Sequence, residues 1–265
     1  MVKRSPKDLT QKQIKLFVQA ACDASFEGAQ ASLKFFERIP PVEKKADRSP
    51  VTRADREAEM RIRKLLRSSF PDHLIFGEEF GEDGPKDSPF KWWIDPIDGT
   101  LQFIRGIPFW GSVVGLEYRG EVVAGCLHLP AIQLQIYAGR GLGTKLNGSA
   151  CRVSKVSKLK DATISSVGVL RASPTQEKKI ARLAREAYDQ RGAFDVFSHA
   201  CVISGKMDAA LDLGIRPYDV SAVKICVEEA GGKYTSWEGE DSIYSPAGLS
   251  SNGLIHKQCV NILST

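Results

Sequence analysis

The sequence contains one stretch that carries most of the information, Trp92-Trp93-Ile94-Asp95-Pro96-Ile97-Asp98-Gly99-Thr100, an apolar strand ending in two carboxylates. Pro96 restricts the backbone, and Gly99 allows a tight turn that returns Asp98 toward Asp95. Converging carboxylates repel each other unless a cation lies between them, and oxygen ligands select hard divalent ions. The stretch predicts a metal site, with Mg²⁺ as the expected ion, although an aspartate-rich turn alone is also compatible with a plain loop.

Helices and strands are predicted on both sides of this stretch. Apolar residues recur at three- and four-residue intervals over 9–36 and 54–69, which indicates two amphipathic helices. Strand-like runs occupy 73–76, 91–94, 111–118, 121–128 and 134–138 and predict an antiparallel sheet. Residues 99–104 are expected to begin a helix whose free amides, with the Thr100 hydroxyl, would bind phosphate.

After about residue 150 the pattern changes to alternating strands and helices. Strands are expected at 163–169 and 208–213, and helices at 176–189, 198–204 and 220–230, the last closed by Gly231-Gly232. We expect an N-terminal α+β half, 1–150, with the antiparallel sheet and most metal ligands. A C-terminal α/β half, 151–265, is expected to pack with it as one body.

The composition is that of an ordinary soluble protein. The 265 residues include 37 Lys+Arg and 32 Asp+Glu, a net charge of +5, and 42% are hydrophobic. No apolar stretch approaches the ~18–20 residues that a membrane-spanning helix needs. The basic N-terminus lacks the apolar core of a signal peptide, so a cytoplasmic location is expected. The basic charge of the first fifteen residues is interpreted as a solvated tail rather than a nucleic-acid site; it comes from Lys3, Arg4, Lys7, Lys12 and Lys15.

Cysteines and histidines show no metal-binding or catalytic spacing. The six cysteines are widely separated and are expected to be free thiols. The four histidines, His73, His128, His199 and His256, are interpreted as structural.

Acidic residues elsewhere are candidates for the rest of the metal site. Glu78 and Glu79 follow an apolar strand end, so one of them could face the metal while the other is solvated or paired. Asp219 precedes an expected helix and Asp55 lies at the start of another, positions where a carboxylate also serves as a helix cap. The sequence alone leaves both roles open.

The order and spacing of these segments resemble the inositol monophosphatase family of Mg²⁺-dependent, lithium-sensitive phosphatases. The matching segments are 49–55 (SPVTRAD), 77–79 (GEE), 95–100 (DPIDGT) with Phe103, 218–222 (YDVSA) and 229–232 (EAGG). One departure is Tyr218, where the family usually has tryptophan.

This resemblance implies the architecture and the metal ligands. The expected fold is a layered α-β-α-β-α sandwich of the inositol monophosphatase and fructose-1,6-bisphosphatase type, commonly a homodimer. Glu78, Asp95 and the Ile97 carbonyl would hold one Mg²⁺. Asp95, Asp98 and Asp219 would hold a second, and Asp55 would support a weaker third site.

The resemblance also implies the reaction, hydrolysis of a phosphate ester by metal-activated water. Thr100, Glu78 and Asp55 would orient the attacking water, and the Gly99 and Thr100 amides would hold the phosphate. No covalent phosphoenzyme is expected.

Substrate clues resemble the histidinol-phosphatase branch of the family. Segments 77–81 and 106–112 match that branch, and Asp195 lies where it has an acidic residue that would suit the histidinol ammonium group. Against it, Phe194 replaces an expected glycine and His199 stands where an aromatic is common. Asp195 is equally compatible with a loop or cap residue.

The alternatives span different classes of protein. Asp212 occupies the position where inositol phosphatases bind sugar hydroxyls, although it could be only a strand end. The substrate expected first is histidinol phosphate. The alternative is an inositol-1-phosphate phosphatase, or an enzyme with broad specificity or fructose-1,6-bisphosphatase activity. A silent phosphate-binding protein on the same fold is a non-enzymatic alternative. No nucleic-acid or membrane partner is expected.

Overall fold

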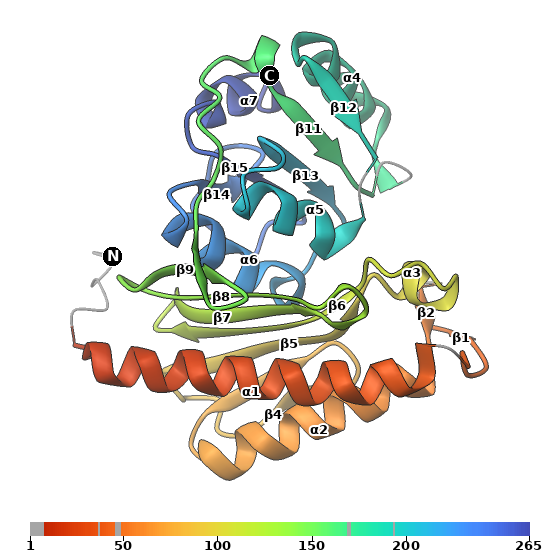
Figure 1. Ribbon diagram of the computed structural model, residues 1–265, viewed down its shortest axis with the longest axis vertical. Helices are drawn as coiled ribbons and strands as arrows, with labels where there is room; N and C mark the ends of the chain where they lie inside the picture. The colour runs from red at the N-terminus through yellow and green to blue at the C-terminus, as the bar shows by residue number, and fades with distance from the viewer. Residues whose placement is uncertain (1–7, 37, 46–48, 169–170, 193) are drawn as a thin grey trace.

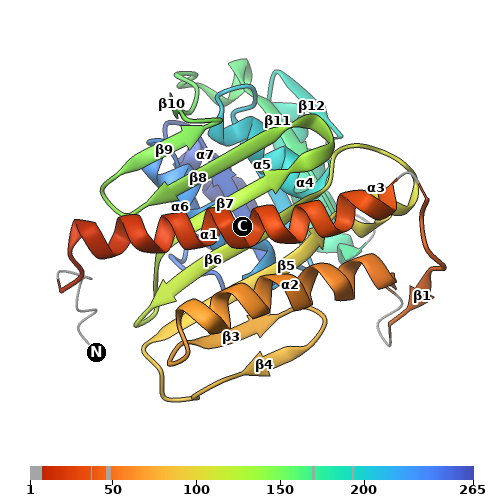
Figure 2. The same ribbon diagram turned by 60° about the horizontal axis from the view of Figure 1, so that its bottom comes forward.

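The computed structural model describes residues 8–36, 38–45, 49–168, 171–192 and 194–265. Lys3, Arg4 and Lys7, which carry most of the basic N-terminal charge, lie outside the described residues. Helices and sheets stack in five layers, which confirms the predicted α-β-α-β-α sandwich (Figure 1). The first layer holds helices α1 (Gln11–Phe36) and α2 (Arg53–Ser69), which lie side by side across one face of the first sheet (Figure 2).

The first sheet has eight strands in the order β10-β9-β8-β7-β6-β5-β3-β4. Its strands are β3 (Leu74–Gly77), β4 (Gly81–Asp83), β5 (Phe90–Asp98), β6 (Gly111–Tyr118), β7 (Glu121–Leu129), β8 (Leu134–Gly139), β9 (Gly143–Leu146) and β10 (Ser149–Cys151). All neighbours are antiparallel except β3 and β5, so the prediction of a purely antiparallel sheet was wrong at this pair. β4 forms a hairpin on the outer side of β3, and β5 on the inner side therefore runs parallel to β3.

The second sheet has five strands in the order β12-β11-β13-β15-β14. They are β11 (Thr163–Ser166), β12 (Asp189–Arg191), β13 (Ala209–Leu213), β14 (Lys233–Ser236) and β15 (Ala247–Ser251). β11 runs parallel to β12 and β13, whereas β15 is antiparallel to β13 and β14. Helices α5 (Asp195–Ile203) and α6 (Pro217–Glu229) lie between the sheets, and α4 (Pro174–Glu186) and α7 (His256–Leu263) cover the outer face.

Short elements complete the chain. They are strands β1 (Glu43–Lys44) and β2 (Pro50–Val51), helix α3 (Thr100–Ile104), and the 3₁₀ turns η1 (Pro130–Ile132) and η2 (Leu159–Asp161). Several boundaries differ from the predictions. The helix predicted at 176–189 spans 174–186, because Ser173 and Gln176 form a capping box and 189–191 form an edge strand. The helix predicted at 198–204 begins at Asp195, and the strand predicted at 163–169 ends at Ser166, with Val169 outside the described residues.

Strand β5 separates two hydrophobic cores. Trp92 and Ile94 point toward α1 and α2 and are fully buried there, while Trp93 points to the opposite face and packs with α6. This alternation is the period-two pattern of a strand buried on both faces. It places Asp95, two residues after Trp93, on the α6 side of the sheet.

Helix α6 lies unusually close to the first sheet because two glycines face it. Gly115 on β6 and Gly125 on β7 are directly paired across the sheet. A Cβ at Gly115 would lie 2.3 Å from the Ser221 Oγ, and one at Gly125 would lie 2.7 Å from the Ala222 Cα. Both contacts are too short for a real side chain, so the glycine pair sets how closely α6 approaches.

No helix among the described residues is long and apolar enough to cross a membrane. The six cysteines are free thiols, as predicted.

We predict that Gly125→Ala lowers the free energy of unfolding by about 1–3 kcal/mol, because the added methyl meets the α6 backbone rather than a movable side chain. Chemical denaturation monitored by circular dichroism measures this change. Gly192→Ala is the matched control, since nothing lies within 4 Å of a Cβ there. Equal stability of the two variants would contradict close packing of α6.

Candidate active site

Asp95 and Asp98 come to one side of β5 because the strand is irregular between them. In a regular strand, residues three apart point to opposite faces. The pairing of β5 with β6 changes register here, since Asp95 pairs with Val113 and Asp98 with Gly111. From Asp95 to Asp98 the chain of β5 advances three residues while β6 advances two, so β5 contains a β-bulge. Pro96 lies in this bulge, where the missing N–H of proline is tolerated.

Asp219 reaches the same point from the other half of the chain. It is the third residue of α6, and its Oδ2 accepts a hydrogen bond of 2.6 Å from the Arg216 backbone N–H. Carboxylate oxygens of Asp95, Asp98 and Asp219 all lie within 4.8 Å of one another. Asp219 is therefore both a helix cap and part of the acidic cluster, which we define as Asp95, Asp98 and Asp219.

Burial and mutual repulsion oppose ionisation of the acidic cluster. Burial is the largest cause for each residue and raises the pKa of Asp219 to about 7. The pKa of Asp95 rises well above its ordinary value through burial and the nearby charge of Glu78. The pKa of Asp98 rises similarly through burial and Asp195. Asp95 is buried, and Asp98 and Asp219 are half-buried. Carboxylates that repel each other in such a site fit a hard divalent cation, which would offset both the burial and the repulsion.

Asp55 lies at the start of α2 and is fully buried. Its Oδ2 accepts hydrogen bonds of 2.7 Å from the Thr52 N–H and hydroxyl in a capping box, while its Oδ1 lies 3.4 Å from the Thr100 hydroxyl. That hydroxyl is also 3.1 Å from the Ile97 carbonyl oxygen. Asp55, Thr100 and Ile97 are thus connected, and burial raises the pKa of Asp55 to about 6.

Glu78 is near the acidic cluster but is held by a lysine. Its charge acts on Asp55, Asp95 and Asp219. The Lys45 Nζ donates to the Glu78 Oε1 at 2.8 Å and to the Glu79 Oε1 at 2.6 Å. Burial raises the pKa of Glu79 to about 7 despite this contact.

Glu59 on α2 fixes the turn that carries Glu78. It is fully buried, and its carboxylate accepts from the Glu79 and Phe80 N–H groups at 2.7 and 3.2 Å. A Cβ at Gly77 would lie 2.0 Å from the Glu59 Oε1, so glycine is required for this approach. The Gly77-Glu78-Glu79 motif therefore owes part of its composition to a buried partner that the sequence did not reveal.

Gly99 links β5 to α3 in a conformation that favours glycine. Its φ is 90°, and a Cβ would lie 3.1 Å from the Gln102 Oε1 and 3.4 Å from the Phe109 carbonyl oxygen. The predicted helix after Asp98 is present as the single turn of α3, which begins at Thr100 beside the acidic cluster.

Asp195 stands at the start of α5 with a strained backbone. Its φ is 28°, which is rare for a residue with a side chain. The next N–H, that of Val196, donates to the Asp98 Oδ2 at 2.5 Å, so α5 is tied to the acidic cluster. Burial, with the charge of Asp212, raises the pKa of Asp195 to about 6, and Gln102 donates a hydrogen bond to it.

Three contacts in the site were missed from the sequence, those of Lys45, Glu59 and His199. His199 donates from Nε2 to the Asp212 Oδ2, a partner that the sequence did not reveal. Lys45 and Glu59 had no motif to mark them. Their charges were visible, but only the fold brings them to Glu78 and Glu79.

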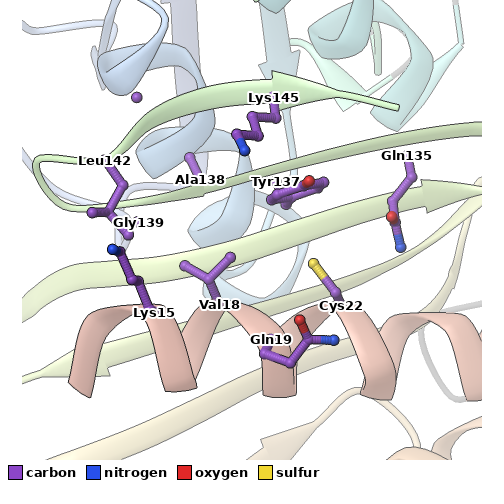
Figure 3. Close-up of a pocket in the computed structure, with 11 residues that line it drawn as sticks. Lys15, Val18, Gln19, Cys22, Gln135, Tyr137, Ala138, Gly139, Leu142 and Lys145 are labelled. Atoms are coloured by element: carbon purple, nitrogen blue, oxygen red, sulfur yellow. The ribbon is translucent and has the colours of Figure 1, made fainter. Parts of the chain in front are cut away.

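A separate pocket of about 440 Å³ lies between α1 and the β8–β9 hairpin (Figure 3). Lys15, Cys22, Tyr137 and Lys145 are among its lining residues, and none of its lining residues is acidic. It lacks the ligands for a divalent cation, so the acidic cluster remains the candidate active site.

Comparison with known proteins decides the family. The model of the inositol monophosphatase family matches residues 10–262. This chain belongs to the inositol monophosphatase family. Its relatives in the family include a histidinol-phosphatase from Chlorobaculum parvum, 36% identical over 236 residues that cover 88% of this chain and 91% of that protein.

Two further proteins are similar to this chain. A fructose-1,6-bisphosphatase/inositol-1-monophosphatase from Thermotoga maritima is 33% identical over 230 residues, or 86% of this chain and 88% of that protein. The crystal structure of SuhB from Bartonella henselae has a TM-score of 0.88 at 27% identity and covers 94% of this chain and 99% of that one. The chain is accordingly a phosphatase, a phosphoric monoester hydrolase, of this family.

We predict that the protein with Mg²⁺ chelated loses thermal stability as the pH rises from about 4 to about 7. The raised pKa values mean that the folded state holds protons that the unfolded state releases, so stability falls across this window. Differential scanning calorimetry should show a fall of roughly 5 °C or more. Adding Mg²⁺ should reverse most of the fall.

Asp219→Asn should flatten this pH dependence, because it removes one of the coupled acids. Asp161→Asn, an exposed acid on η2, is the control and should leave it intact. A melting temperature that rises over the same pH range would be incompatible with the repulsion described.

Proposed function

We propose that this phosphatase is Mg²⁺-dependent and hydrolyses a small-molecule phosphate ester by direct attack of water. The observation that carries the proposal is the acidic cluster, whose three carboxylates come from both halves of the chain and meet within 4.8 Å. Bound Mg²⁺ supplies Lewis acidity that activates water and neutralises phosphate charge. A silent phosphate-binding protein would not need one buried and two half-buried acids held so close together.

The chain's own residues would hold the ion and the reactants. The oxygens of Asp95, Asp98 and Asp219 would bind Mg²⁺, with Glu78, the Ile97 carbonyl and Asp55 completing two or three ion sites. Thr100, which lies between Asp55 and Ile97, would orient the attacking water. The Gly99 and Thr100 amides would hold phosphate oxygens at the turn where β5 enters α3.

Histidinol phosphate is the substrate that we propose first. Asp195 is largely buried beside Asp212 and would gain from a cationic partner such as the ammonium group of histidinol. Its left-handed backbone costs about 1–3 kcal/mol, a strain typical of functional positions. The similarity to the Chlorobaculum parvum histidinol-phosphatase supports this choice.

Inositol-1-phosphate is the second candidate, with broad activity that includes fructose 1,6-bisphosphate. Asp212, buried on β13, would then accept from sugar hydroxyls. The similarity to the Thermotoga maritima enzyme favours this alternative. Lithium sensitivity and a homodimer stay predictions from the family resemblance, and a cytoplasmic location stays a prediction from the sequence of the N-terminus.

We predict that Asp95→Asn abolishes phosphate release, with a loss of at least about 1,000-fold in kcat, because a central metal ligand is removed. Malachite-green assay of released phosphate with Mg²⁺ or with a chelator measures this. Asp161→Asn is the control. Turnover that survives either chelation or Asp95→Asn would refute the metal mechanism.

For the substrate, Asp195→Asn should lower kcat/KM for histidinol phosphate by about tenfold or more, because a charged hydrogen bond is lost. Steady-state kinetics with histidinol phosphate, inositol-1-phosphate and fructose 1,6-bisphosphate at matched concentrations measures the preference. Asp189→Asn, a surface acid paired with Arg191, is the control. A wild-type preference for inositol-1-phosphate would instead assign the specificity role to Asp212.

A further inference from the structure

One carboxylate oxygen near the acidic cluster has no hydrogen-bond partner among the described residues. Asp212 on β13 is 4% exposed, and its Oδ1 is buried and unpaired. Leaving a buried acceptor unpaired is destabilising, and more so when it belongs to a charged group. Such an atom is expected where a ligand supplies the missing donor.

Asp212 is connected to the candidate active site through α5, whose Val196 N–H donates to the Asp98 Oδ2 and whose His199, one turn later, contacts the Asp212 Oδ2. The charge of Asp212 contributes to the raised pKa values of Asp98, Asp195 and Asp219. Asp212 is thus within electrostatic reach of two members of the acidic cluster and of the acid at the start of α5. A substrate whose phosphate is bound at the acidic cluster would place its alcohol portion in this region.

The other oxygen of Asp212 is held by a histidine with two partners. Nε2 of His199 on α5 donates to the Asp212 Oδ2, because a carboxylate can only accept. Nδ1 of His199 is 2.8 Å from the hydroxyl of Ser250 on β15. The ring is 2% exposed, and each of its nitrogens has a protein partner. These two contacts set the orientation of the ring.

The sheet places the two partners of His199 next to each other. β13 and β15 are antiparallel, with Ala210 opposite Ser250 and Asp212 opposite Gly248. Ser250 and Asp212 therefore project from the same face, toward α5. His199 bridges this face and α5, and fixes which oxygen of Asp212 stays free.

We propose that His199 is a positioning residue. Its hydrogen bond to the Asp212 Oδ2 leaves the Oδ1 free to accept from an ammonium or hydroxyl group on the substrate's alcohol. This inference rests on the proposed phosphatase function and on the proposed contact of Asp212 with the substrate's alcohol, and it adds a residue that positions Asp212. His199 itself does not touch the phosphate. Its effect is on recognition of the leaving alcohol.

The test compares esters with and without a donor on the alcohol. His199→Phe keeps an aromatic ring but removes the N–H, and His199→Gln restores a donor. Kinetics are measured on histidinol phosphate, inositol-1-phosphate and 4-nitrophenyl phosphate, the last having no N–H or O–H donor on its alcohol. For His199→Phe we expect kcat/KM on the preferred donor-bearing ester to fall by about tenfold, mainly through KM.

The same variant should change kcat/KM for 4-nitrophenyl phosphate by less than about twofold, and His199→Gln should recover most of the loss. His256→Phe is the matched control, since His256 is also buried with two hydroxyl partners, Thr235 and Ser251. His256→Phe should lower the melting temperature without altering the ratio of kcat/KM for the donor-bearing ester to kcat/KM for 4-nitrophenyl phosphate.

Two outcomes would overturn the inference: no loss on any ester, or an equal loss on all three esters. If His199→Phe unfolds below the assay temperature, Ser250→Ala removes the Nδ1 partner and must show the same substrate-selective loss. Absence of Mg²⁺-dependent phosphate release by the wild type on all three esters would overturn the proposed function itself, which keeps the two failures distinct.

Discussion

The site depends on the close contact between α6 and the first sheet. Gly115 and Gly125 leave room for the Ser221–Ala222 backbone, and this contact carries Asp219 to the acids of β5. Side chains at the two glycines would hold the helix away, and the three carboxylates could not share one cation. A packing constraint several residues from the chemistry thus sets the geometry of the acidic cluster.

Helix starts organise the acids that the fold brings together. Asp55 and Asp219 are each the third residue of a helix, and each carboxylate accepts from the backbone N–H of its N-cap residue. The positive end of the helix dipole favours a carboxylate there. A helix cap can therefore also belong to a cluster of acids that could bind a metal. The sequence left both roles open for Asp219, and the structure shows it both as a cap and in the acidic cluster.

The two parts of the candidate site, the acidic cluster and the group of Asp195, Asp212 and His199, differ in how well the sequence predicts them. The proposed phosphate end lies in one short stretch, because a single bulged strand carries Asp95 and Asp98 and leads directly into Gly99. The proposed alcohol end is assembled from α5, β13 and β15, so Asp195, Asp212 and His199 have only weak individual signals. The proposed substrate specificity accordingly rests on residues that contact one another from distant parts of the chain.

By itself the sequence predicted the main helices and strands and the turn with Asp95 and Asp98, because periodicity and local turn chemistry are short-range properties. The layered fold and the place of Asp219 in the cluster followed from the family resemblance. Only the tertiary structure decided the parallel pairing of β3 with β5, the hold of Lys45 on Glu78 and Glu79, and the His199–Asp212 pair. These contacts join segments far apart in the chain. Pairing of this kind depends on how the layers pack, which no local pattern encodes.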